Sequence, residues 1–178
     1  MAMDVFMYFE GTGAKGTEIA GETKDSIMTE KKAMEIFSFS LGATNPTTIG
    51  SAGSGLSGGK VSITSFNIMK RADSSSPSIF KACCIGDHFP KAFVVMRRSG
   101  ASGEIGGEPF MIYEFAEVMV ESIQWSGSSG GDSVPTESAS FAFGAMSISY
   151  MAQDATGAMG DAIVQSWSLT TNTATLNV

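Results

Sequence analysis

The stretch KRADSSSPSIFKACCIGDHFPKAFVVMRRSG, residues 70–100, decides the fold because it predicts a helix inside a chain otherwise composed of strands and turns. Ser76 is a suitable N-cap, and Pro77 fits the first helical position. Gly86 supplies the left-handed residue that commonly ends a helix. The sequence therefore predicts one short helix over Pro77–Ile85, followed by a strand.

The predicted helix carries an apolar stripe that has to hold it against the rest of the protein. Phe80, Cys83 and Cys84 recur at the spacing of one helical face, with Ile79 beside them. A helix of nine residues is too short to be stable alone in water, so we expect this stripe to dock on a sheet. The two cysteines are neighbours in sequence and fit disulfide geometry poorly, so we expect free thiols.

Strand chemistry fills the rest of the chain. Runs rich in Val, Ile, Phe, Tyr and Met lie between turns rich in Gly, Ser and Pro. The predicted strands are residues 5–10, 31–41 with a bulge, 60–69 with a bulge near Ser65, 92–96, 110–115, 118–125, 136–153 and 162–170. Residues 42–59, dense in Gly, Ser and Thr, are predicted to form a long loop. We therefore expect one mainly β domain over residues 1–178 with a short flanking helix.

Length, composition and charge narrow the function classes. The chain has 178 residues, of which 43% are hydrophobic and 16% charged, and its net charge is −7. Residues 1–98 hold 11 basic and 9 acidic residues, whereas residues 99–178 hold 9 acidic residues and no basic one. An acidic chain is a poor candidate for nucleic acid binding, and the uneven charge suggests acidic and basic faces that meet between copies. With neither a membrane-spanning run nor a signal-peptide pattern, we expect cytoplasmic synthesis and no membrane insertion.

The sequence contains two motifs that resemble phosphate-binding loops, and neither has the required context. Residues 11–16, GTGAKG, match G-x-G-x-x-G, but no helical stripe follows them, so we interpret them as a turn. In SGSGLSGGKV, Ser54 and Val61 stand where a P-loop needs Gly and Ser or Thr. His88 lies in the predicted turn after the helix, where a hydrogen bond to the backbone is expected. The sequence predicts no catalytic residue, no metal site and no cofactor, and thus not an enzyme.

Several predicted strands are apolar on both faces and hold few charges. In a small barrel only the inner face should be that apolar. One short helix cannot cover the second face, so the sequence predicts an obligate oligomer whose sheets pack or join between copies.

An ordered series of segments resembles the Hcp (haemolysin-coregulated protein) family of bacterial type VI secretion. The matching segments are MDVFMYFEG, FSFSLG, GKVSITSFNIMKRAD, SSPSIFKACCIGDHFPKAFVVMRRSG and residues 107–153, and they span nearly the whole chain. The strand–helix–strand centre in the fourth segment is the most specific of them. Phe37 and Phe39 depart from the family, which often has tryptophan there.

The resemblance implies a small β-barrel of two sheets with one flanking helix, assembled as a hexameric ring. It implies that rings stack into a tube, which a contractile sheath expels under a spike protein and which holds effector proteins in its lumen. It also implies export to the extracellular space or a target cell without a signal peptide.

Two sets of residues follow as expectations for assembly. We expect the 42–59 loop to reach the adjacent ring through Asn45, Pro46, Ile49, Leu56 and Ser57. We expect neighbouring subunits to meet along the strand of residues 136–153, through Phe141, Phe143, Met146, Ile148 and Tyr150. The tail tube of a related contractile particle or phage, and a small-ligand-binding β-barrel, remain alternatives at this point.

Overall fold

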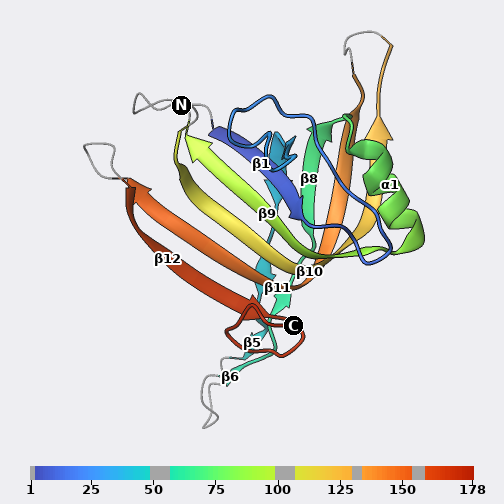
Figure 1. Ribbon diagram of the computed structural model, residues 1–178. Coiled ribbons are helices and arrows are strands. Elements are labelled where there is room, and N and C mark those ends of the chain that lie inside the picture. Colours follow the sequence, from blue (N-terminus) through green and yellow to red (C-terminus); the bar gives the residue numbers. More distant parts are fainter. Residues whose placement is uncertain (1–2, 49–56, 99–106, 130–133, 154–158) are drawn as a thin grey trace.

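The computed structural model describes residues 3–48, 57–98, 107–129, 134–153 and 159–178. In these ranges the chain is mainly β with one helix, as the sequence predicts (Figure 1). The elements are, in chain order, β1 (Met3–Glu10), β2 (Met34–Glu35), β3 (Ser38–Ser40), β4 (Ala43–Thr44), β5 (Thr47–Thr48), β6 (Ser57–Gly58), β7 (Ser62–Ile63), β8 (Phe66–Arg71), α1 (Ser76–Ile85), β9 (His88–Arg98), β10 (Pro109–Ser126), β11 (Thr136–Gln153) and β12 (Met159–Ser168).

Eight of the strands form one antiparallel sheet, in the order β2-β1-β9-β10-β11-β8-β3, with β12 paired to β11. β11 has β10 along one side and two shorter strands along the other. β8 pairs with Thr136–Phe141 of β11, and β12 pairs with the part from Ala145 to Gln153. β8 and β12 therefore lie end to end, and β12 forms an outer edge of the sheet.

The sheet is irregular at Glu117, in the middle of β10 between its neighbours β9 and β11. On a regular strand buried residues recur at every second position. Near Glu117, facing buried residues lie three positions apart on each strand, and Ala116 and Ala145 between them are also buried. The buried neighbours are Phe89 and Ala92 on β9, Phe115 and Val118 on β10, and Phe143 and Met146 on β11. Glu117 itself has a φ of 51°, which marks the irregularity. The irregularity lies between the α1 end and the β12 end of the sheet, which are on opposite sides of the molecule (Figure 1).

The segment predicted as one strand over residues 31–41 is divided between two ends of the sheet. β2 pairs with β1, and β3, which starts after two intervening residues, pairs with β8. The prediction of a continuous strand is wrong because the chain passes here from one side of the sheet to the other. We call residues 34–40 the closing segment.

Other strand boundaries differ less from the predictions. β10 is one strand of 18 residues, where two were expected, and the irregular residue Glu117 lies between the two predicted strands. The break between β7 and β8 confirms the predicted irregularity near Ser65. β9 begins at His88, so this residue starts a strand and does not lie in a turn. β11 covers residues 136–153, as predicted.

The boundaries of α1 agree closely with the prediction. The helix begins at Ser76, with Ser75 as the N-cap and Pro77 in its first turn. Gly86 ends it with a φ of 58°, and the N–H groups of the cap bond to the carbonyls of Ala82 and Cys83.

The face of α1 that docks on the sheet is only partly the predicted one, because Ile79 and Cys83 pack into or against the core whereas Phe80 and Cys84 do not. Ser76, Ile79 and Ala82 are buried, whereas Phe80 is 50% exposed and Cys84 is exposed. The apolar stripe is shifted because β10 lies beside the helix and lets Phe80 pack against Trp125 at the rim, with ring centres 5.8 Å apart. Both cysteines are free thiols, as expected.

The main core lies between the strands and under α1. It is built from side chains on the inner face of the sheet together with the buried residues of α1. These include Val5, Met7, Phe9, Phe66, Ile68, Ile79, Phe89, Val94, Met96, Phe115, Val118, Phe141 and Phe143. We call residues 11–33, between β1 and β2, the N-terminal segment. A smaller cluster of Phe6, Met28, Ala33 and Val95 packs this segment on the opposite face of β1 and β9.

Candidate assembly surfaces

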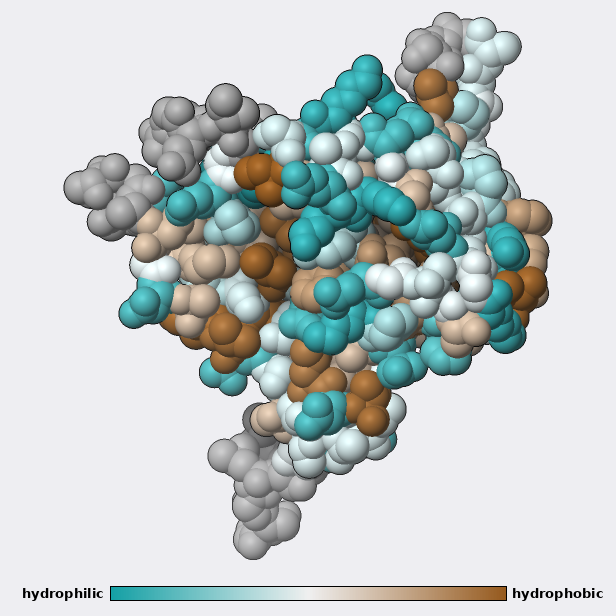
Figure 2. Space-filling model, viewed as in Figure 1, coloured by the Kyte–Doolittle hydropathy of each residue, from teal (hydrophilic) through white to brown (hydrophobic). Residues whose placement is uncertain are grey.

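β12 and the adjoining half of β11 expose a concentration of apolar side chains. Ile163 is 65% exposed and Val164 is 52% exposed. In the ladder Ile163 stands opposite Tyr150, and Val164 opposite Ser149, so the two apolar residues lie on different faces of the strand. Figure 2 shows the hydrophobic colour gathered over β12 at the lower left. We call Ile148, Tyr150, Ile163 and Val164 the edge surface.

The sequence of β12 explains why this surface is open. Ala162, Ile163 and Val164 are consecutive, so both faces of the strand are apolar, and only β11 pairs with it in the described part of the chain. A sheet edge with free backbone groups and apolar side chains is a template for pairing with another chain. The arrangement suits contact with a second protein surface.

The structure separates the five predicted interface residues into two groups. Phe141, Phe143 and Met146 are buried, at 1%, 8% and 6% exposure, in the core of their own subunit. Ile148 and Tyr150 are each 37% exposed and belong to the edge surface. An interface role stays a prediction, and only the second group presents enough surface to carry it.

The segment predicted as a loop over residues 42–59 is a two-stranded arm at its described ends. β4 pairs with β7, and β5 pairs with β6. Asn45 and Pro46 are exposed between these rungs. Ser57 lies in β6, whereas Ile49 and Leu56 lie outside the described residues. Figure 1 shows β5 and β6 projecting from the body of the protein, and we call residues 43–48 and 57–63 the hairpin arm.

The GTGAKG turn binds an anion, and that anion is the protein's own Asp87. The backbone N–H of Lys15 donates to Oδ1 of Asp87 over 2.7 Å, and that of Thr17 donates to Oδ2 over 3.1 Å. A side chain at Gly13 would fall within 2.5 Å of this carboxylate. The glycine pattern thus serves to fold the turn around a carboxylate, in agreement with its interpretation as a turn.

Burial by itself would raise the pKa of Asp87, but hydrogen bonds outweigh it. Donors from Lys15, Thr17 and His88 hold the pKa below the ordinary value of 3.8. The carboxylate therefore stays charged in the interior and fastens the N-terminal turn to the end of α1.

A second buried charge network fixes the start of α1. The Nζ atom of Lys70 lies 2.8 Å from Oε1 of Glu137 and 2.6 Å from Oδ1 of Asp73, and both Lys70 and Glu137 are fully buried. The indole N–H of Trp125 donates to Oε2 of Glu137 over 2.9 Å. Asp73 also accepts a bond from the hydroxyl of Ser75, the N-cap.

Ion pairs also join the basic and acidic parts of the sequence within one subunit, and a contact of charged faces between copies stays a prediction. Lys70 of the basic part pairs with Glu137 of the acidic part inside one subunit. Lys91 pairs with Glu114 over 2.7 Å, and the hydrogen bond to Glu114 raises the pKa of Lys91. The two parts of the sequence are therefore joined by charge within the protomer.

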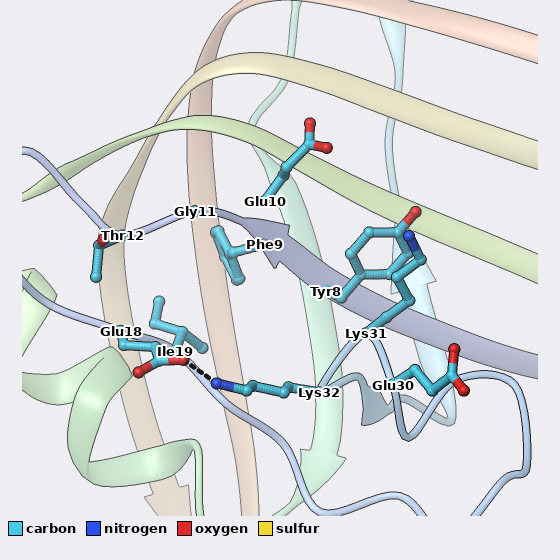
Figure 3. A pocket seen from close by; sticks show the side chains of 10 residues that line it. All are labelled: Tyr8, Phe9, Glu10, Gly11, Thr12, Glu18, Ile19, Glu30, Lys31 and Lys32. Carbon is cyan, nitrogen blue, oxygen red and sulfur yellow. Dashed lines mark hydrogen bonds and ion pairs between the residues drawn. The ribbon is translucent and has the colours of Figure 1, made fainter.

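A small open hollow of about 380 Å³ lies between β1 and the N-terminal segment (Figure 3). Lys32 reaches across it to pair with Glu18, and the Nζ atom of Lys31 lies 5.8 Å from the centre of the Tyr8 ring. Glu10 points away from these groups (Figure 3). The Lys32–Glu18 ion pair and the Lys31–Tyr8 contact hold the N-terminal segment against β1.

The titratable groups also form no metal-ligand cluster in the ranges that the structure describes. No three His, Cys, Asp or Glu side chains there converge as metal ligands. Nε2 of His88 lies 3.9 Å from Oε2 of Glu117. The carboxylate of Glu117 is thus a polar neighbour of this side chain, for which a backbone hydrogen bond was expected.

Comparison with known proteins identifies the family. A family model described as "Type VI secretion system effector, Hcp" matches residues 6–150. The chain belongs to the Hcp family. Protein hcp1 of Pseudomonas aeruginosa is 30% identical over 114 residues, which cover 64% of this chain and 68% of that protein.

Solved structures agree with this membership across nearly the whole chain. A structure described as that of a type six secretion system protein is 30% identical, with a TM-score of 0.85, and the match covers 98% of this chain and 100% of that one. Hcp1 from Salmonella typhimurium is 27% identical, with a TM-score of 0.75 and the same coverage.

The protein is therefore an Hcp protein of type VI secretion, a secreted structural component of that system. The comparisons do not favour the phage-tail or ligand-binding alternatives. No helix in the described ranges is both long and apolar enough to span a membrane. Sequence reasoning missed Ile163 and Val164, although the consecutive apolar residues of β12 were a usable signal for them.

Proposed function

We propose that this Hcp protein is a tube subunit, in which residues 1–178 form one two-sheet barrel and six copies close into a ring. The observation that carries the proposal is the edge surface on β12, whose apolar side chains are exposed on both faces. A neighbouring subunit that pairs with this edge would cover Ile163 and Tyr150 on one side and Val164 on the other. Such a contact joins two different surfaces and can close a ring by repeating the same rotation.

The rings would stack into a tube through the hairpin arm. The arm has only two strands, is exposed at residues 43–47 and 58–60, and contacts the main core at its base through Ile63. A two-stranded ribbon is at best marginally stable in water, so contact with another ring would order it. Membership of the family supports a contractile sheath, a spike protein and effectors in the lumen as partners, and export through type VI secretion without a signal peptide.

Substitutions on β12 test the ring. We expect native mass spectrometry of the purified protein to give the mass of six copies. Ile163→Lys and Val164→Lys place a charge in the contact, and each should shift the protein toward lower mass with an unchanged circular dichroism spectrum. Phe80→Lys is the matched control, because Phe80 is similarly exposed at 50% but lies on α1. A monomeric wild type, or hexamers that persist in both β12 variants, would contradict the proposal.

A further inference from the structure

The pairing of β12 with β11 is not uniform along its length. Over most of the ladder the opposing residues follow one register, in which Met151 stands opposite Ala162. Past a shift of one position, Gln153 stands opposite Met159. The ladder therefore contains two registers that differ by one residue, and the edge surface borders the boundary between them.

The side chains of β12 distinguish poorly between these two registers. A shift of one residue turns every side chain of a strand to the other face of the sheet. Because Ala162, Ile163 and Val164 are all apolar, such a shift would only exchange one apolar side chain for another on each face. Trp167, opposite Met146, favours the observed register, but its buried indole N–H has no hydrogen-bond partner among the described residues, which offsets part of this preference. The register beside the edge surface therefore needs a support outside the strand.

Such a support follows directly after β12, in residues 169–178, which we call the strap. Figure 1 shows the chain turning back here beneath the lower end of the sheet. The N–H of Ser168 donates to the carbonyl of Thr173, so the strap closes on the last residue of β12. Leu169 packs against the main core, and its N–H donates to the carbonyl of Gly144 over 2.8 Å, one position beyond the last ladder pair. The strap thus joins β12 to β11 in the register of the edge surface.

Gly144 is also the place where the far part of the strap meets the sheet. A Cβ atom at this position would clash with a methyl group of Val178 and would lie 3.4 Å from Cβ of Glu117 on β10. The φ of Gly144 is not in the positive region, so the glycine is required here for space and not for a turn. Any other residue at this position would displace Val178 without straining the backbone of β11.

We propose that Gly144 and the strap are the register lock of β12, which decides the faces that Ile163 and Val164 take. With the lock released, the register now found at Gln153 extends along the strand, and Val164 takes the face of Ile163. The inference rests on the proposed function in one respect, because a neighbouring copy that packs on the edge surface needs one fixed arrangement of these side chains. The register itself is a property of the single subunit.

Disulfide trapping reads the register directly. Ser147 stands opposite Ser166 in the observed register, and it would stand opposite Gln165 in the shifted one. The observed pair, Ser147→Cys with Ser166→Cys, and the shifted pair, Ser147→Cys with Gln165→Cys, are made in a background of Cys83→Ser and Cys84→Ser. Opposing residues of antiparallel strands lie close enough for a disulfide to form. With the lock intact, we expect only the observed pair to oxidise within one subunit, as measured by peptide mass spectrometry.

Substitutions at Gly144 release the lock. Gly144→Ile fills the seat of Val178 with a residue that suits a strand, and it should raise the yield of the shifted disulfide relative to the observed one about fivefold. Gly144→Ala adds only the clashing methyl group, so it should give a smaller change in the same direction, and it keeps the test decisive if Gly144→Ile does not fold. Ala142→Ile, two residues earlier on the same face of β11, is the matched control and should leave the ratio unchanged. An unchanged ratio in both Gly144 variants would overturn the proposal.

Assembly gives the second measurement. Gly144→Ile leaves every residue of the edge surface in place, yet it should lower the fraction of hexamer in native mass spectrometry, whereas Ala142→Ile should not. If the edge surface does not build the ring, the wild type shows no hexamer, but the disulfides still report the register. If the strap does not lock the register, hexamers form normally and the disulfide pattern is the same in the wild type and in both Gly144 variants.

Discussion

The α1–β9 unit, residues 76–98, and the β12 edge surface carry similar apolar side chains, which are buried in the first region and exposed in the second. In the α1–β9 unit, Ile79, Phe89 and Val94 are fully buried within the subunit, and the nearby charges of Lys70 and Asp87 have partners. On β12, Ile163 and Val164 are more than half exposed. One region is complete in a single copy, whereas the other leaves apolar surface for a second copy to cover.

The difference predicts whether a substitution should change the stability of the protomer or its assembly. Changes in the α1–β9 unit and its supports should lower the free energy of unfolding of the protomer. Changes on the edge surface should leave folding nearly unaltered and alter assembly. The two tryptophans, Trp125 near α1 and Trp167 on β12, allow both regions to be followed by fluorescence.

The largest effect on stability is expected from Lys70→Met. The variant leaves the buried carboxylate of Glu137 without its cation, which should lower the free energy of unfolding by about 3–5 kcal/mol. Urea denaturation followed by Trp125 fluorescence measures this loss. Lys70→Met combined with Glu137→Gln should recover part of it, and a single variant that costs less than about 1 kcal/mol would show that the network is not what fixes α1.

A pair of substitutions on α1 sharpens the assignment of its docking face. Ile79→Ala empties a fully buried site and should cost about 2–4 kcal/mol. Phe80→Ala removes a half-exposed ring and its contact with Trp125, and should cost about 1 kcal/mol. Thermal and urea unfolding of both variants give the comparison. A larger cost for Phe80→Ala would restore the face predicted from the sequence.

Asp87→Asn tests the turn that joins the N-terminal segment to α1. The amide keeps fewer of the bonds donated by Lys15 and Thr17, and the expected cost at neutral pH is about 1–3 kcal/mol. The pKa of Asp87 is lowered on folding, so its stabilisation is complete above the ordinary value of 3.8 and is lost as the pH falls through the lowered value. The difference between wild type and variant should therefore shrink from pH 7 toward pH 3.

The control for this pH dependence is Asp161→Asn, on the exposed surface of β12. Its difference from wild type should stay small and constant over the same range. A gap between wild type and Asp87→Asn that widens on acidification would contradict the assignment.

The smallest effect on protomer folding is expected on the edge surface. Val164→Ser changes a half-exposed side chain of an edge strand, and should alter the stability of the dissociated subunit by about 0.5 kcal/mol or less. In the same samples, size-exclusion chromatography should show weaker assembly than for wild type. A large loss of protomer stability would mean that β12 belongs to the core of its own subunit.

Local signals in the sequence located most of the elements. The helix boundaries followed from Pro77 and Gly86, because caps act within one turn of the chain. The limits of β11 and the irregularity near Ser65 followed from the alternation of apolar residues. Local signals did not predict that residues 31–41 form two strands. The strands are separate because β2 pairs with β1 and β3 pairs with β8.

The assignment of faces needed distant residues. Phe80 and Ile79 are both apolar, and only the position of β10 decides which of them is buried. The interface prediction named Phe141, Phe143 and Met146, which pack in the core of their own subunit with residues from β1, β8, β9 and β10. Periodicity identifies an apolar face, but not what covers it.

The sequence by itself determined that the chain is mainly β with one capped helix, that GTGAKG forms a turn, and that it is an Hcp protein, because these depend on residue order and local chemistry. Only the tertiary structure decided that Lys70 meets Glu137 within one subunit and that Ile163 and Val164 remain exposed. Those facts depend on which strands pair. Pairing joins residues far apart in the chain, so it is set by the packing of the whole fold and not by any one stretch.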